Sequence, residues 1–122
     1  MWTYQQTTGA ISRDGGATLG TGYSGFGAGK NNPALEYEQN IGPVPRGRYG
    51  IGAPEDPDGG PHGPFILPLD PDPSNQMFGR SGFLIHGDSI IRPGTASRGC
   101  IILAREIREQ IAASGDADLE VV

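Results

Sequence analysis

The chain has 122 residues, of which 35% are hydrophobic, so it has material for one modest core and little room for a second domain. We therefore expect residues 1–122 to form a single domain. The net charge of −5 argues against a nucleic-acid partner, and the lack of any run approaching ~20 apolar residues argues against membrane insertion.

The first quarter of the chain predicts a strand followed by a loop. Residues 2–12 alternate loosely between apolar and polar side chains, which is typical of a strand or a hairpin arm, and Asp14–Gly16 is a strong turn signal. Residues 20–29 contain five glycines. We expect this segment to be a loop anchored by Tyr23 and Phe26 rather than a regular element.

The middle of the chain predicts short strands separated by turns. A tight turn at residues 42–47 leads into a strand that starts at Arg48. Residues 54–64 are acidic and rich in proline and glycine, which favours an exposed loop. The apolar runs at residues 65–69 and 82–86 predict two further strands. With 21 glycines and 11 prolines in the whole chain, we expect a β protein with many turns.

The last quarter of the chain predicts a helix. Leu103, Ile107 and Ile111 recur at intervals of four with charged residues between them, which favours a helix near residues 103–113. Residues 118–122 predict a closing strand. The expected fold class is therefore mainly β, a β-rich α+β protein with mixed or antiparallel sheets and one principal helix.

Two segments carry residues suited to nucleophilic catalysis. Cys100 is the single cysteine, so it has no partner for an internal disulfide, and a thiol becomes a strong nucleophile when a nearby histidine takes its proton. His86 ends an apolar strand, which aims the imidazole from a rigid element. Cys100 comes shortly before the predicted helix, whose amides and dipole favour a thiolate. Ser97 and Gly99 flank positions from which backbone amides face an oxyanion.

The spacing of these residues leaves other interpretations open. Free cysteine is among the most buried residue types, so a packed structural thiol is the commoner outcome for Cys100 on spacing alone. For His86 a satisfied, partly buried side chain is favoured on the same ground. A metal site is not expected, because His62, His86 and Cys100 do not have the spacing of zinc-finger ligands.

Several motifs in a fixed order give the chain a family resemblance. His86-Gly87, Pro93-Gly94 and Ser97-x-Gly99-Cys100-Ile101 resemble the signature of L,D-transpeptidases with a YkuD-like catalytic domain. The run Pro45–Ile51 resembles an upstream Pro-x-Gly-x-Tyr/Phe-x-Ile element of the same family. The chain is still more similar to the L,D-transpeptidase effectors delivered by type VI secretion, in these segments: Trp2-x-Tyr4-x-Gln6, Gly22–Gly25, Asn31–Pro33, Gly42–Tyr49 and His86–Asp88.

This resemblance implies a YkuD-like fold and a cysteine enzyme that needs no cofactor and acts on the tetrapeptide stems of peptidoglycan. Cys100 is then the nucleophile, His86 acts first as base and later as acid, and Ser97 and Gly99 shape the oxyanion pocket. The broad family has a histidine where this chain has Arg98. A site with one histidine favours L,D-carboxypeptidase activity or D-amino-acid exchange over cross-linking.

Four residues near the motif are candidates for holding the stem peptide. Arg98 and Arg92 form, together with Arg80, a local excess of positive charge, and the stem carries carboxylates that arginine binds well. We expect Arg98, or else Arg92, to contact one of them, with solvated surface arginines as an equally open interpretation. Asp88 orients its loop or His86, or is a solvated turn residue. Tyr23 lines the substrate groove or belongs to the core.

The resemblance also implies a biological setting. An antibacterial effector of this kind has a component of the secretion apparatus as one partner, acts in the periplasm of a target bacterium, and is neutralised by an immunity protein that occludes its active site. Residues 1–6 carry neither the basic nor the apolar region of a secretory signal, which fits this route and fits equally a chain from which a leader has been removed. Two other functions remain open: a non-catalytic peptidoglycan-binding module, and a secreted domain with a buried structural cysteine.

Overall fold

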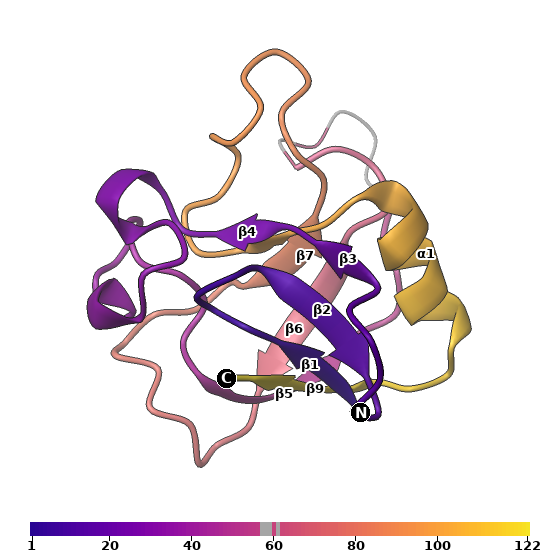
Figure 1. The fold of residues 1–122 in the computed structure, drawn as a ribbon. Coiled ribbons are helices and arrows are strands. Elements are labelled where there is room, and N and C mark those ends of the chain that lie inside the picture. The colour runs from indigo at the N-terminus through magenta and orange to yellow at the C-terminus, as the bar shows by residue number, and fades with distance from the viewer. Residues whose placement is uncertain (57–59, 61) are drawn as a thin grey trace.

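The computed structural model describes residues 1–56, 60 and 62–122. Short strands dominate these residues, and α1 is the single α-helix among them (Figure 1). The elements follow one another as β1 (Trp2–Tyr4), β2 (Ala10–Arg13), β3 (Gly20–Thr21), β4 (Tyr23–Ser24), the 3-10 helices η1 (Gly27–Gly29) and η2 (Pro33–Leu35), β5 (Gly47–Ile51), β6 (Leu67–Pro71), β7 (Leu84–His86), β8 (Ile101–Ile102), α1 (Arg105–Ala113) and β9 (Asp118–Val121). The prediction of a mainly β fold with one principal helix is confirmed.

The strands of the described residues form one mixed sheet. They are hydrogen-bonded in the order β3-β2-β1-β9-β5-β6-β7-β8-β4. Most neighbours are antiparallel, whereas β1 pairs with β9 and β7 pairs with β8 in parallel. Parallel neighbours need a crossover connection. The crossover from β7 to β8 is the long loop that projects at the top of Figure 1.

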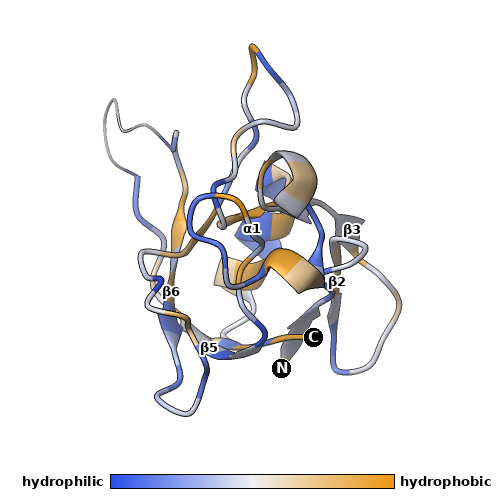
Figure 2. Cartoon of the chain, turned by 90° about the vertical axis from the view of Figure 1, so that its left-hand side faces the viewer, coloured by the Kyte–Doolittle hydropathy of each residue, from blue (hydrophilic) through white to orange (hydrophobic). Residues whose placement is uncertain are grey.

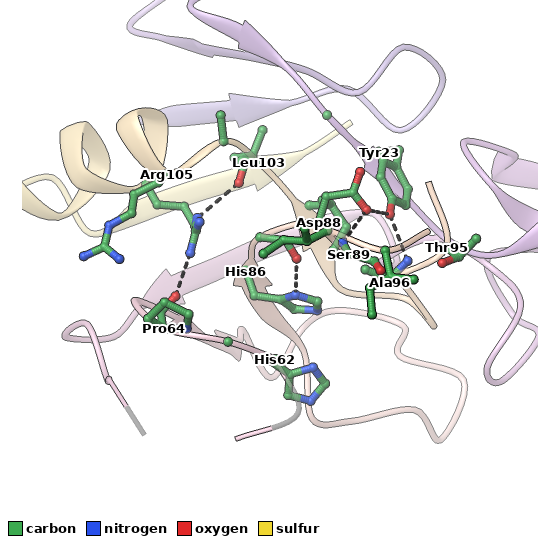
Figure 3. A pocket seen from close by; sticks show the side chains of 18 of the residues that line it. Tyr23, His62, Pro64, His86, Asp88, Ser89, Thr95, Ala96, Leu103 and Arg105 are labelled. Carbon is green, nitrogen blue, oxygen red and sulfur yellow. Dashed lines mark hydrogen bonds between the residues drawn. The ribbon is translucent and has the colours of Figure 1, made fainter. Parts of the chain in front are cut away.

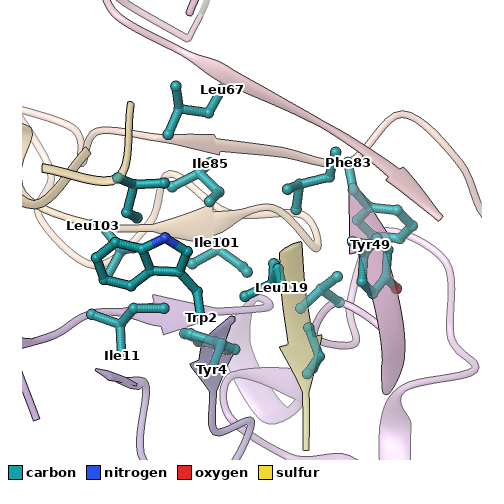
Figure 4. Close-up of a cluster of buried hydrophobic side chains, with 14 of the residues drawn as sticks. Trp2, Tyr4, Ile11, Tyr49, Leu67, Phe83, Ile85, Ile101, Leu103 and Leu119 are labelled. Carbon is teal, nitrogen blue, oxygen red and sulfur yellow. The ribbon is translucent and has the colours of Figure 1, made fainter. Parts of the chain in front are cut away.

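Side chains from alternate strand positions meet in one core (Figure 4). In β1, Trp2 and Tyr4 are buried on either side of the half-buried Thr3. Ile85 of β7 and Ile101 of β8 are fully buried and paired with each other. Because successive side chains of a strand point to opposite faces, this pair fixes the direction of its neighbours on both strands.

The helix packs one face against this core. Ile107 and Ile111 are buried, and Figure 2 shows the division of α1 into hydrophobic and hydrophilic sides. The helix begins at Arg105 rather than at Leu103, because the Leu103 N–H donates to the carbonyl oxygen of His86 at 3.1 Å and prolongs the β7–β8 pairing. In the described part of the chain, α1 and the two 3-10 helices are all too short or too polar to cross a bilayer.

The segment at residues 20–29, expected to be a loop, contains β3 and β4. Ser24 of β4 pairs with Ile101 of β8. Gly22 passes so close to β8 that a Cβ at this position would lie 1.6 Å from the carbonyl oxygen of Ile102. The glycines therefore allow a close approach between strands, which composition alone does not distinguish from a loop.

The predicted exposed loop at residues 54–64 is described in part. Residues 57–59 and 61 lie outside the described residues. Of the others, Asp56 and His62 are exposed, and Glu55 forms an isolated bridge with Ile66. The following strand β6 starts at Leu67, two residues after the predicted start.

Candidate active site

The parallel pair of strands β7 and β8 brings the segments of the two predicted catalytic residues side by side. Ile85 is paired with Ile101, and His86 with Ile102. The Ile85–Ile101 pair belongs to the core, so His86, the next residue of β7, points to the opposite side. Cys100 immediately precedes β8, so strand alternation does not fix the direction of its side chain.

Cys100 lies half-buried immediately before β8. Its sulfur accepts the N–H of Leu84 at 3.4 Å and lies 4.0 Å from the carbonyl oxygen of Gly82. Burial raises the pKa of the Cys100 thiol, whereas the Leu84 N–H and the positive charge of Arg80 act to lower it. The backbone donor at the sulfur therefore comes from β7. The expectation that the N-terminus of the helix supplies it is not met, because β8 lies between Cys100 and α1.

His86 is 2% exposed and presents one unpaired nitrogen. Its Nδ1 lies 2.8 Å from the carbonyl oxygen of Gly87. Because a carbonyl only accepts, Nδ1 carries the proton and the neutral ring has its lone pair on Nε2. In the described structure Nε2 is buried without a hydrogen-bond partner. Burial lowers the pKa of His86, so the ring is neutral near pH 7 and Nε2 is available to accept a proton.

No hydrogen bond joins His86 to Cys100 among the interactions that the structure describes. The sulfur is bonded to Leu84, and the His86 ring lies beside His62 with the ring centroids 4.6 Å apart. In enzymes without substrate, catalytic hydrogen bonds are often long and tighten only in the complex. The pairing of β7 with β8 thus brings a thiol and a neutral imidazole to neighbouring segments without joining them.

A cavity of about 1090 Å³ opens beside His86. Its walls come from β4, the residues before β6, the loop after β7, and the start of α1. Figure 3 shows His86 between His62 on one side and Asp88 on the other. Six of the lining residues are Tyr23, His62, Pro64, His86, Asp88 and Arg105; Cys100 is not among the lining residues that the structure describes.

His62 is a site residue that the sequence did not reveal, because it lies in a proline- and glycine-rich run without periodicity. Its segment is held by the buried Arg108 of α1, whose Nη1 donates to the carbonyl oxygens of Pro64 at 2.9 Å and Phe65 at 2.7 Å. Among residues 1–56, 60 and 62–122, no group of three His, Cys, Asp or Glu side chains is arranged to hold a metal ion.

Ser97 and Gly99 brace the backbone that precedes the thiol. The fully buried Ser97 hydroxyl donates to the carbonyl oxygen of Cys100 at 2.6 Å and accepts the N–H groups of Gly25 and Gly99. The Gly99 carbonyl accepts the hydroxyl of Ser24 at 2.8 Å. The Gly99 amide already has a partner, so in this arrangement Ser97 and Gly99 position Cys100 rather than offer a free donor to an oxyanion.

Tyr23 and Asp88 tie the loop between β7 and β8 to β4. The Tyr23 hydroxyl donates to Asp88 Oδ1 at 2.6 Å and accepts the N–H of Ala96 at 2.9 Å. Asp88 also accepts the N–H groups of Ser89 and Gly94. Burial and the bond to Asp88 raise the pKa of Tyr23 to about 12. Asp88 therefore orients its own loop, and Tyr23 lines the cavity.

The arginines near the motif have contrasting surroundings. Arg98 is exposed, and its guanidinium lies 4.3 Å from the centre of the Phe26 ring. Arg92 is exposed in the loop between β7 and β8. Arg80, by contrast, is 5% exposed and donates to backbone carbonyls. Arg98 and Arg92 are accessible to a ligand, and Arg80 is not.

The fold and the site together define a mainly β protein with a half-buried thiol and a neutral histidine on adjacent parallel strands. The family model of the Tlde1 domain matches residues 19–119, a range that includes Tyr23, His86 and Cys100. The chain belongs to this family, the L,D-transpeptidase effectors of type VI secretion. Comparisons with curated proteins and with solved structures found no match.

Proposed function

We propose that this protein is a cysteine enzyme that modifies peptidoglycan, acting on tetrapeptide stems as an L,D-carboxypeptidase or by exchanging the terminal D-amino acid. One observation carries the proposal: the parallel β7–β8 pairing sets His86 and the segment of Cys100 side by side in a chain of the Tlde1 domain family. A YkuD-like catalytic fold is part of the same proposal.

The reaction starts when the Cys100 sulfur attacks the carbonyl carbon of the third stem residue and its proton passes to His86 Nε2. The substrate, or a rotation of the imidazole, closes the gap between the two side chains. The peptide bond to D-alanine then breaks, and His86 returns the proton to the leaving amine. A thioester remains on Cys100. Water converts it to a tripeptide stem, and a free D-amino acid converts it to a new tetrapeptide.

The cavity beside His86 is the proposed site for the stem peptide. Its volume of about 1090 Å³ lies just above the ~300–1,000 Å³ typical of small-molecule pockets. Arg105 lies on its wall, and Arg98 and Arg92 are exposed nearby in the chain. Guanidinium groups bind carboxylates through paired hydrogen bonds, so these arginines fit the carboxylates of a stem peptide.

We also propose that the protein is an antibacterial effector, delivered with a component of the secretion apparatus and active in the periplasm of a target cell. Membership in the Tlde1 domain family supports this setting. An immunity protein that covers the His86 cavity would protect the producing population.

The test is to incubate purified tetrapeptide muropeptides with the protein, with and without D-methionine, and to measure product masses. We expect loss of one alanine residue without the added amino acid, and replacement of alanine by methionine with it. Tripeptide muropeptides lack the bond to D-alanine and serve as the substrate control. Cys100→Ala serves as the protein control. Unchanged masses with the wild-type protein would refute the proposal.

A non-catalytic peptidoglycan-binding module is the second candidate. It is favoured by the raised pKa of the Cys100 thiol and by a sulfur that is bonded to Leu84 rather than to His86. In that case wild-type protein and Cys100→Ala would bind isolated peptidoglycan equally well, and neither would change muropeptide masses. If Cys100 is instead only a packing residue, iodoacetamide would fail to label it in the folded protein.

A further inference from the structure

Among the described residues, Arg80 is a buried cation without an acidic partner. Its guanidinium donates to four backbone carbonyl oxygens, those of Glu36, Pro43, Gly42 and Arg98. The Glu36 carboxylate forms its ion pair with Arg46, and no ion pair joins Arg80 to an acid in the part of the chain that the structure describes. A buried charge balanced only by peptide dipoles is costly, so its position requires an explanation.

The guanidinium lies directly against the backbone that leads to Cys100. Gly99 has a φ of +136°, and a Cβ at this position would lie 2.6 Å from Arg80 Nη2 and 2.9 Å from the Phe83 ring. Nη2 also donates to the carbonyl oxygen of Arg98 at 3.4 Å. Only glycine at position 99 leaves room for this contact. The motif Gly99-Cys100 and the buried Arg80 therefore form one structural unit.

Arg80 is also the charged group that acts on the sulfur. Around Cys100, the Leu84 N–H and the Arg80 charge favour a thiolate, against the effect of burial. Three titratable groups face Arg80: Tyr49, Glu36 and Cys100 itself. Of these, Glu36 is already paired with Arg46. A guanidinium keeps its charge in proteins, so this positive charge is permanent. His86 is not bonded to the sulfur, and its neutral ring offers no charge.

We propose that Arg80 is the positioning residue of the nucleophile: its guanidinium fixes residues 98–100 and supplies the permanent positive charge that stabilises the Cys100 thiolate. The inference rests on the proposed function for the role of Cys100 as nucleophile. The effect on the thiol itself is measurable without any substrate.

The test is the rate of Cys100 alkylation by iodoacetamide as a function of pH. In Arg80→Gln the amide keeps donors for the carbonyls but removes the charge. We expect the midpoint of the pH profile to rise by about one unit, which is about a tenfold slower alkylation at pH 7. Arg80→Lys keeps the charge, and its midpoint should stay within about 0.3 units of wild type. Arg48→Gln removes an exposed charge on β5 and is the matched control, with an unchanged midpoint.

Two results would overturn the proposal. One is an unchanged midpoint in folded Arg80→Gln, and the other is an equal upward shift in Arg80→Lys. If Arg80→Gln does not fold, as judged by its thermal unfolding, the lysine variant decides: a retained midpoint supports the charge effect, and a one-unit rise contradicts it. A shifted midpoint combined with unchanged muropeptide masses would contradict the proposed enzyme activity and support the role of Arg80 at the thiol. Changed muropeptide masses with no shift of the midpoint would support the enzyme activity and contradict the role of Arg80.

Discussion

The two sides of the candidate site are built differently. Around Cys100 the backbone is held by hydrogen bonds from Ser97, Ser24 and Arg80. Around His86 the ring nitrogen Nε2 has no partner in the described structure. The adjoining loop carries two exposed side chains, Ile90, which is 97% exposed, and Ile91, which is 90% exposed. The Cys100 side is thus held by several hydrogen bonds, whereas the His86 side keeps one buried ring nitrogen without a described partner. A buried polar group without a partner is destabilising, so the two sides differ in how far their polar groups are satisfied.

The largest effect should come from removing the nucleophile. We expect Cys100→Ala to lower the release of D-alanine from tetrapeptide stems by at least about a thousandfold, since no other thiol exists in the chain. The free energy of unfolding should fall by only about 1 kcal/mol, because the side chain is half-buried and the Leu84 N–H loses a long contact to sulfur. Both are measured on the same preparation, by chromatography and by urea unfolding. Substantial residual activity would place the nucleophile elsewhere.

The next largest effect should come from His86→Gln. Loss of a general base lowers the rate by about 10²- to 10⁴-fold, and it should also slow the labelling of Cys100 by iodoacetamide near pH 7. His62→Gln is the comparison, because this ring lies 4.6 Å from that of His86 without sharing its strand. A smaller loss of rate in His62→Gln than in His86→Gln would identify His86 as the base. Equal losses would mean that the two imidazoles act together.

Ser97→Ala tests whether the Cys100 side is held as firmly as its hydrogen bonds imply. The variant leaves the Gly25 and Gly99 amides without their acceptor, so we expect a loss of about 1–3 kcal/mol in the free energy of unfolding. Ser74→Ala removes an exposed hydroxyl that bonds only Asp72 and should cost less than about 0.5 kcal/mol. The measurement is urea unfolding of both variants. Equal losses would mean that the Ser97 network adds nothing beyond an ordinary surface contact.

Much of the fold was predictable because its elements are regular. The periodicity of Ile107 and Ile111 predicted α1, and the apolar run before His86 predicted β7. The strand β4 was not predictable, because its pairing depends on the close approach at Gly22 to a strand about 80 residues later. Local sequence reports local periodicity, whereas the partner of a two-residue strand is decided by the rest of the fold.

The candidate site divides in the same way. The motifs shared with the family singled out Cys100 and His86, and the parallel pairing of β7 with β8 brings their segments side by side. Neither His62 nor the buried role of Arg80 could be predicted, because both residues reach the site through tertiary contacts from separate segments. An arginine that bonds only carbonyl oxygens has no complementary acid whose spacing could reveal it.

A smaller effect is expected for the two exposed arginines near the motif, Arg98 and Arg92. Arg98→Ala should raise the KM for tetrapeptide about tenfold with kcat nearly unchanged, because a lost charge-assisted hydrogen bond weakens binding by roughly 1.5 kcal/mol. Arg92→Ala is the matched variant, since both side chains are exposed. A change in one variant identifies the arginine that contacts the carboxylate. Unchanged kinetics in both variants would mean that the two arginines are solvated surface residues that do not contact the substrate.

The smallest effect is a pH dependence of stability that comes from the histidine side alone. Burial lowers the pKa of His86 from 6.5, so the unfolded chain binds a proton at this position in a range where the folded chain does not. Stability should therefore be level above pH 6.5 and fall as the pH is lowered below it. Asp88 and Glu36 have lowered pKa values and lose their contribution only in more acidic solution, so the window from about pH 6.5 to 5 belongs mainly to His86. Urea unfolding across this window should show the slope in wild type and in Cys100→Ala, and a flatter profile in His86→Gln. The same slope in all three proteins would mean that the unpaired imidazole is not what distinguishes the two sides of the site.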